Sequence, residues 1–183
     1  MGLNYKSLDQ ITRNKMVEEF KADIDNNAIY LSKRFTEEGC KYYIEVMTIH
    51  LKNGNDDSLA NDLKNANCFK SHEERKTAKG TSQVKVPETA SQTFSEGEFN
   101  RFYIRGLCLR ALAEGASLCV YRARHSENPR AESEALIGKI FDSTQLLVDL
   151  RNNIGIDTAL GLPSGPNSGL SIELIASVVT SPL

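Results

Sequence analysis

Apolar residues recur every three or four positions through the first third of the chain, which is the pattern of amphipathic helices. Ser7 and Gln10 have the spacing of a capping box, so the first helix is predicted to begin there. Thr36 can cap a second helix that ends at Gly54, and a short third helix is expected after Asp56. The apolar positions of these helices are Leu8, Ile11, Val17, Phe20 and Ile24, then Cys40, Tyr43, Ile44, Met47 and Leu51, then Leu59 and Leu63.

The periodic pattern stops between 71 and 93. This stretch reads HEERKTAKGTSQ and then has a few apolar residues near Val84, so it offers little surface to bury. Connections of this length are uncommon in compact domains unless they are functional or mobile. We therefore expect a long irregular connection over 71–94, extended near Val84.

A helix start is well marked just after this stretch. Ser95 and Glu98 form a capping box, and Phe94 and Phe99 occupy the two positions of a hydrophobic staple. The sequence therefore predicts a helix over about 96–115. Apolar residues cover almost its whole circumference, which is typical of a central, buried helix. They are Phe99, Phe102, Tyr103, Ile104, Leu107, Cys108, Leu109, Ala111, Leu112 and Ala113.

The C-terminal part mixes short strands with one more helix. The segment 117–123 has the length and composition of a strand, and leucines predict a helix over 144–151. Glycine and proline make 154–169 a shaped loop. A terminal strand over 170–179 is expected to pair with the strand at Cys119.

These elements predict an α+β fold that is mainly helical. A central buried helix over about 96–115 is expected to pack with a small antiparallel strand pair and long irregular loops. The 183 residues suit one domain, because 40% of them are hydrophobic and 25% are charged. Within this domain, 1–70 form the helical N-terminal third, 71–94 the extended connection, and 95–183 the α+β part.

Arginine and lysine are segregated: seven of the ten arginines follow Phe99, but only one of the twelve lysines does. Arginine pairs with carboxylates and phosphates through a planar fork, so these positions are candidates for interaction. The interaction candidates are Arg101, Arg105, Arg122, Arg124, His125 and Arg130.

Two interpretations of these candidates stay open. In the first, the arginines form structural ion pairs, or subunit contacts of the same type, with Glu98, Glu114, Glu127, Glu132 and Glu134. In the second, a phosphate or nucleic-acid groove is made by Arg122, Arg124, His125 and Arg130. From Phe99 onward the chain carries eight basic and eight acidic residues, and its net charge is −2. This balance favours ion pairs over binding of a polyanion.

No motif indicates catalysis, a metal or another cofactor. The four cysteines, at 40, 68, 108 and 119, form no C-x-x-C pair and are expected to be reduced core thiols. His50, His72 and His125 are isolated, and no pattern of a nucleophile with its base is present. The chain also has no signal-peptide pattern and no stretch of about 18 apolar residues, so we expect neither secretion nor a membrane span.

Four segments resemble a family of tailed-bacteriophage and prophage proteins that has no assigned activity. They are EGEFNRFYIRGLCLRA at 96–111, VYRAR at 120–124, NPRAESEALIG at 128–138 and DTALGLPSGPNSG at 157–169. The resemblance implies a gene among virion-assembly genes, but it assigns no catalytic residue.

On this basis we expect a non-enzymatic structural or interaction protein of a phage particle, such as a capsid-associated, head-completion or connector component. Its partners would be other virion proteins or copies of itself, with no membrane partner. It would lie in the host cytoplasm during assembly and then in the virion. A small nucleic-acid-binding or host-modulating phage protein is the alternative, with nucleic acid possible but not favoured, and an enzyme of unrecognised type is the third.

Overall fold

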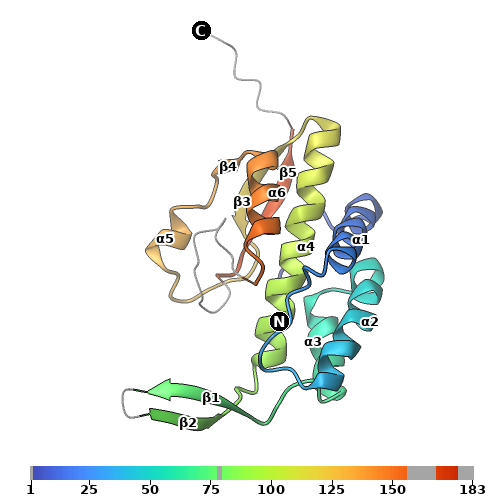
Figure 1. Ribbon diagram of the computed structural model, residues 1–183. Helices are drawn as coiled ribbons and strands as arrows, with labels where there is room; N and C mark the ends of the chain where they lie inside the picture. Colours follow the sequence, from blue (N-terminus) through green and yellow to red (C-terminus); the bar gives the residue numbers. More distant parts are fainter. Residues whose placement is uncertain (1, 78–79, 156–167, 177–183) are drawn as a thin grey trace.

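The computed structural model describes residues 2–77, 80–155 and 168–176 and shows a mainly helical α+β fold (Figure 1). Its helices are α1 Gln10–Asp25, α2 Glu37–Asn53, α3 Asp56–Asn65, α4 Ala90–Glu114, α5 Ala131–Glu134 and α6 Ser143–Asn152. Its strands are β1 His72–Thr77, β2 Gly80–Lys85, β3 Ser117–Arg122, β4 Ile140–Phe141 and β5 Leu170–Ile175.

The long helix α4 runs through the centre of the molecule (Figure 1). Helices α1 and α3 pack on one side of it, while α6 and the sheet that contains β3 and β5 pack on the other. Phe99, Tyr103 and Leu107 are fully buried along it, which confirms the prediction of a central buried helix. None of the helices in the described ranges is long and apolar enough to cross a lipid bilayer.

Helix α4 begins earlier than the capping-box pattern predicts. It starts at Ala90, and Ser95 lies inside it with a fully buried side chain. The predicted capping box and staple are therefore wrong. Packing of α4 against the N-terminal helices favours a longer helix, which begins before Phe94 and Ser95. At the other end, Gly115 adopts a left-handed conformation (φ 66°), and its amide donates to the Ala111 carbonyl.

The starts of α2 and α3 follow the sequence pattern, whereas the start of α1 does not. The Thr36 hydroxyl accepts a hydrogen bond from the Gly39 amide at 2.9 Å, which confirms the predicted cap of α2. Helix α1 is capped by Asp9 and not by Ser7. The Ser7 amide instead donates to the Tyr103 hydroxyl at 3.1 Å, because the chain before α1 lies against α4 and β3.

The predicted irregular connection contains a β-ribbon, formed by β1 and β2, that projects from the body (Figure 1). The strands pair antiparallel from His72 opposite Lys85 to Thr77 opposite Gly80. Near the body, the Arg34 guanidinium binds both carboxylate oxygens of Glu73 at 2.7 Å. Strand β2 includes Val84, so the expected extended backbone near this residue is confirmed. The prediction of irregular structure for the rest of the ribbon is wrong, because backbone pairing forms the strands although they have no apolar face.

The second sheet has the order β4-β3-β5 and is antiparallel throughout. Cys119 of β3 lies opposite Glu173 of β5, which confirms the predicted pairing of these strands. The short elements α5 and β4 were not predicted, because four and two residues are too short for a periodic pattern. Most of the predicted loop over 154–169 and the end of the predicted terminal strand lie outside the described residues.

Candidate functional site

The predicted interaction arginines do not gather at one surface. Arg105 is 2% exposed and lies inside the molecule. Its Nε donates to Glu19 at 2.8 Å, and its two terminal nitrogens bind Asp23 at 2.6 and 2.7 Å. Glu19 also accepts hydrogen bonds from Arg151 of α6. Arg105 is therefore held by carboxylates of α1, which the sequence did not identify as its partners.

Each carboxylate of this cluster lies beside at least one arginine. Burial by itself raises the pKa of Glu19, but hydrogen bonds from Arg151 and charge interaction with Arg105 outweigh it and hold the pKa below its ordinary value. The cluster joins α1, α4 and α6 around one carboxylate. We interpret it as structural, because breaking one partner of a buried ion pair leaves an uncompensated charge.

Arg101 is likewise turned inward, toward the end of α6. It is 7% exposed and donates to the carbonyl oxygens of Leu150 and Asn153, both at 2.9 Å. Glu98 lies 3.4 Å from its Nε, as predicted from the sequence. The Arg101 guanidinium therefore satisfies carbonyls that a helix end leaves without a partner.

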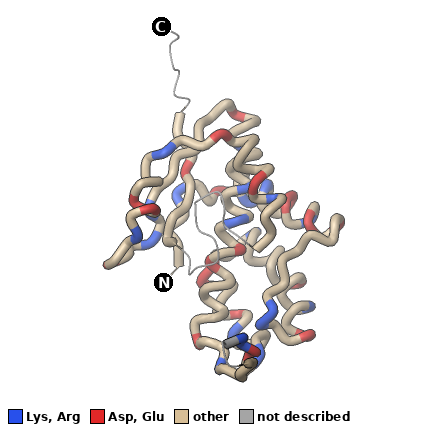
Figure 2. Tube along the Cα trace, turned by 60° about the vertical axis from the view of Figure 1, so that its left-hand side comes forward, with Lys and Arg blue, Asp and Glu red and all other residues tan. Residues whose placement is uncertain are grey.

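The other four candidates lie at or after the end of β3. Arg122 forms an ion pair with Glu134 and donates to the Ser168 carbonyl at 3.1 Å. Arg124 lies 2.9 Å from Glu96 of α4. His125 and Arg130 are exposed. Figure 2 shows basic and acidic positions interspersed along the described chain, and two of the four candidates, Arg122 and Arg124, are paired with carboxylates.

Glu96 belongs to a second group of buried acidic residues, close to the N-terminal segment. Asp56 is fully buried, and one of its oxygens accepts from the Leu3 amide at 3.0 Å. Glu96 is 2% exposed, and burial raises its pKa to about 7, an effect that the Arg124 charge only partly offsets. Burial also raises the pKa of Asp56. The two carboxyl groups are thus held where ionisation is unfavourable.

A Ser-His-Asp chain of hydrogen bonds joins α2 to α3, although the sequence suggested that His50 is isolated. His50 Nδ1 lies 2.9 Å from the Ser58 hydroxyl, and Nε2 lies 2.9 Å from Asp62. Ser58 also closes the capping box of α3 with Asn55. A Cβ placed on Gly54 would be 2.5 Å from the Ser58 oxygen, so backbone covers the hydroxyl closely. We interpret the chain as a helix-joining contact, and the signal in the sequence is that Ser58 and Asp62, four residues apart, lie on the same face of α3.

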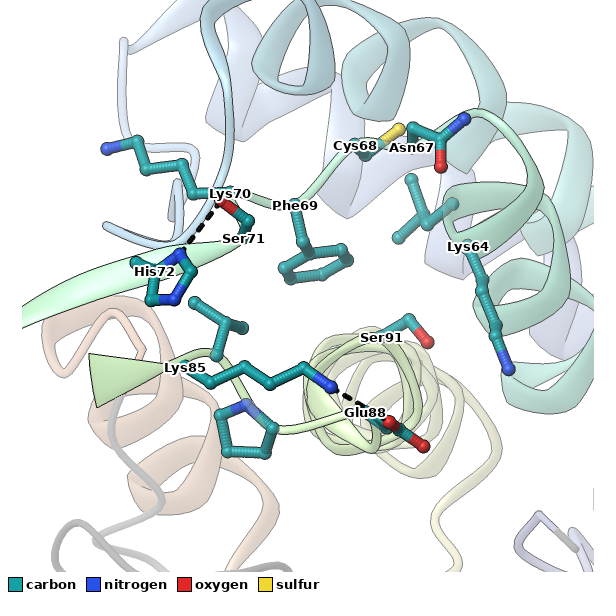
Figure 3. A pocket seen from close by; sticks show the side chains of 13 residues that line it. Lys64, Asn67, Cys68, Phe69, Lys70, Ser71, His72, Lys85, Glu88 and Ser91 are labelled. Carbon is teal, nitrogen blue, oxygen red and sulfur yellow. Dashed lines mark hydrogen bonds and ion pairs between the residues drawn. The ribbon is translucent and has the colours of Figure 1, made fainter. Parts of the chain in front are cut away.

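The principal cavity of interest lies at the foot of the β1–β2 ribbon, and we call it the foot pocket (Figure 3). Its volume is about 410 Å³, within the usual range of ligand pockets. The end of α3, the connection to β1, the end of β2 and the first turn of α4 form its walls. Its lining residues are Leu63, Lys64, Asn67, Cys68, Phe69, Lys70, Ser71, His72, Lys85, Val86, Pro87, Glu88 and Ser91.

The foot pocket combines an apolar floor with a basic rim. Leu63, Cys68 and Val86 are buried, and the Phe69 ring projects toward the first turn of α4 (Figure 3). The lysines of the rim, Lys64, Lys70 and Lys85, are exposed. The sequence missed this site because its side chains come from four separate segments. Burial raises the pKa of the Cys68 thiol, so this cysteine is not an activated nucleophile.

Comparison with protein-family models, curated proteins and solved structures finds no match to this chain. Within the described ranges, no three His, Cys, Asp or Glu side chains are grouped so that they could hold a metal ion. The four cysteines are free, two of them buried and two half-buried.

Proposed function

We propose that this protein is a non-enzymatic structural protein of a tailed-phage particle, a capsid-associated, head-completion or connector component that contacts other virion proteins or copies of itself. It would act in the host cytoplasm during assembly and then remain in the virion. The phage setting is supported by the resemblance of the four segments between 96 and 169. The contact function is supported by the β1–β2 ribbon.

The main support for the proposal is that both edges of the ribbon are open to another strand. Its two strands form a sheet of their own, and among the described elements no further strand covers either edge. Apart from the half-buried Glu73 and Val84, the side chains described in it are exposed. A lone two-stranded hairpin is only marginally stable in water, and an open edge is a template for another strand. A partner that adds a strand would stabilise the ribbon.

Shortening the ribbon tests this proposal. Replacing 74–83 with Asn-Gly keeps the strand ends and the Arg34–Glu73 pair, so the fold should be retained within about 1 kcal/mol, as for changes away from the core. We expect the wild type to be found by mass spectrometry in purified virions of its phage and the shortened protein to be lost from them. Lys52→Ala, on an exposed residue of α2, is the control. Absence of wild-type protein from the virions, or normal incorporation of the shortened form, would contradict the proposal.

The second candidate function is nucleic-acid binding by the same ribbon. Arg75, Lys76 and Lys85 are exposed on it, and the major groove of DNA admits a two-stranded ribbon. Binding of this kind weakens steeply with salt, and each lost phosphate contact lowers the logarithmic slope by about 0.9 for duplex DNA. An Arg75→Gln/Lys76→Gln variant with an unchanged melting temperature and a slope lower by about two would favour this candidate.

A further inference from the structure

Most of the charge around the foot pocket is positive. Lys64, Lys70 and Lys85 line it, and Glu88 is the one carboxylate among its lining residues. Glu88 lies 3.2 Å from the Lys85 ammonium, but these side chains are 83% and 72% exposed, so the pair is weak. The Lys70 ammonium donates to the Lys33 carbonyl at 2.9 Å and has no carboxylate partner among the lining residues. A ligand with a negative charge would therefore be attracted to the rim.

The first turn of α4 adds polar groups that also favour a negatively charged ligand. Ser91 lines the pocket and is 6% exposed, and its hydroxyl makes no hydrogen bond to another side chain in the described part of the chain. Thr89, the cap residue, makes no side-chain cap hydrogen bond to the amides of this turn. The uncapped start of a 25-residue helix carries partial positive charge. A hydroxyl that lines the pocket beside such a helix start is suited to donate to an anionic oxygen.

The apolar floor of the foot pocket favours a ligand that also has an apolar group. Leu63, Cys68 and Val86 are buried, and the Phe69 ring points toward the first turn of α4 (Figure 3). An inorganic anion would leave this floor uncovered. A peptide with an acidic residue beside a large apolar side chain satisfies both parts of the pocket.

We propose that the foot pocket binds such a peptide segment of an assembly partner, with its carboxylate among Lys64, Lys85 and Ser91 and its apolar side chain against Phe69 and Val86. The source of the peptide rests on the proposed function. The position of the pocket supports it: His72 and Lys85, the ends of the paired strands, line the pocket. A partner strand added to the ribbon would enter or leave at this point.

The experiment titrates isotope-labelled protein with acetyl-Glu-Leu-Phe-Glu amide and records amide chemical shifts. We expect saturable shifts at Leu63, Phe69, Val86 and Ser91, with a dissociation constant on the order of 1 mM, as suits a short peptide. The uncharged acetyl-Gln-Leu-Phe-Gln amide should bind about tenfold more weakly. Sodium phosphate at equal ionic strength should cause no saturable shifts at Phe69 or Val86. Saturation by phosphate at these residues, or equal binding of both peptides, would overturn the proposal.

Two variants locate the binding. Lys64→Gln/Lys85→Gln should weaken the acidic peptide about tenfold, whereas Lys41→Gln/Lys52→Gln, which removes two exposed lysines of α2 away from the pocket, should not change its affinity. Equal weakening in both variants would show nonspecific attraction and refute the site. The ribbon with 74–83 replaced keeps its foot and should bind the peptide normally. Peptide binding by a protein that does not enter virions would refute the proposed function and leave the pocket in place.

Discussion

Replacing Glu96 with glutamine should stabilise the protein at alkaline pH and have almost no effect at acid pH. Burial of its side chain raises the pKa of this carboxyl group from 4.5 to about 7, and neighbouring Asp56 and Asp57 act in the same direction, while Arg124 opposes them. The folded protein therefore keeps this proton between about pH 4.5 and 7, where the unfolded chain has lost it. Stability from this group falls as pH rises through that window and then stays constant.

The magnitude follows from the two pKa values. A difference between 4.5 and about 7 corresponds to about 3 kcal/mol of destabilisation of the folded state above pH 7. The pKa of about 7 already includes the attraction of Arg124, so the loss of that charge pair is not subtracted again. The variant should thus be more stable than the wild type by about 3 kcal/mol at pH 8, and by less than about 1 kcal/mol at pH 5.

Urea unfolding of both proteins at pH 5, 6, 7 and 8 measures this difference, because other titrating groups cancel in the comparison. Glu134→Gln is the control: its carboxylate is 49% exposed beside Arg122, so its effect on stability should be small. If Glu96→Gln destabilised the protein equally at pH 5 and pH 8, pairing with Arg124 would dominate over burial, and the reasoning would be wrong.

Two further predictions concern the packing of α4. Arg105→Met should lower the free energy of unfolding by about 3–5 kcal/mol, because it leaves half-buried Asp23 without a cation and buried Glu19 with Arg151 alone. Arg110→Met, in exposed ion pairs, should lower it by about 1 kcal/mol or less in the same urea assay. Gly106→Val should lower the free energy of unfolding by at least about 1–3 kcal/mol, because a Cβ at this position would lie only 2.9 Å from a side chain of α1. An unchanged melting temperature would show that α1 does not cross α4 at this residue.

The sequence by itself determined the elements that carry a periodic apolar pattern or a local cap. Thr36 and Gly54 mark the two ends of α2, three leucines mark α6, and the all-round apolar pattern of α4 predicts its central position. The pairing of β3 with β5 also followed, because two short apolar strands have few other places to bury their side chains. These signals are local, or they depend on one uniformly apolar surface.

Only the tertiary structure decided the features that depend on distant residues. The ribbon lacks an apolar face, so its strands exist through mutual hydrogen bonding and the contact of Arg34 with Glu73, 39 residues away. Arg105 finds its carboxylates 82 and 86 residues earlier in the chain, and this choice moved a predicted surface arginine into the core. The foot pocket is assembled from four segments whose charges and apolar groups carry no shared spacing. Residue types can indicate which bonds are possible, but the folded chain selects the partners.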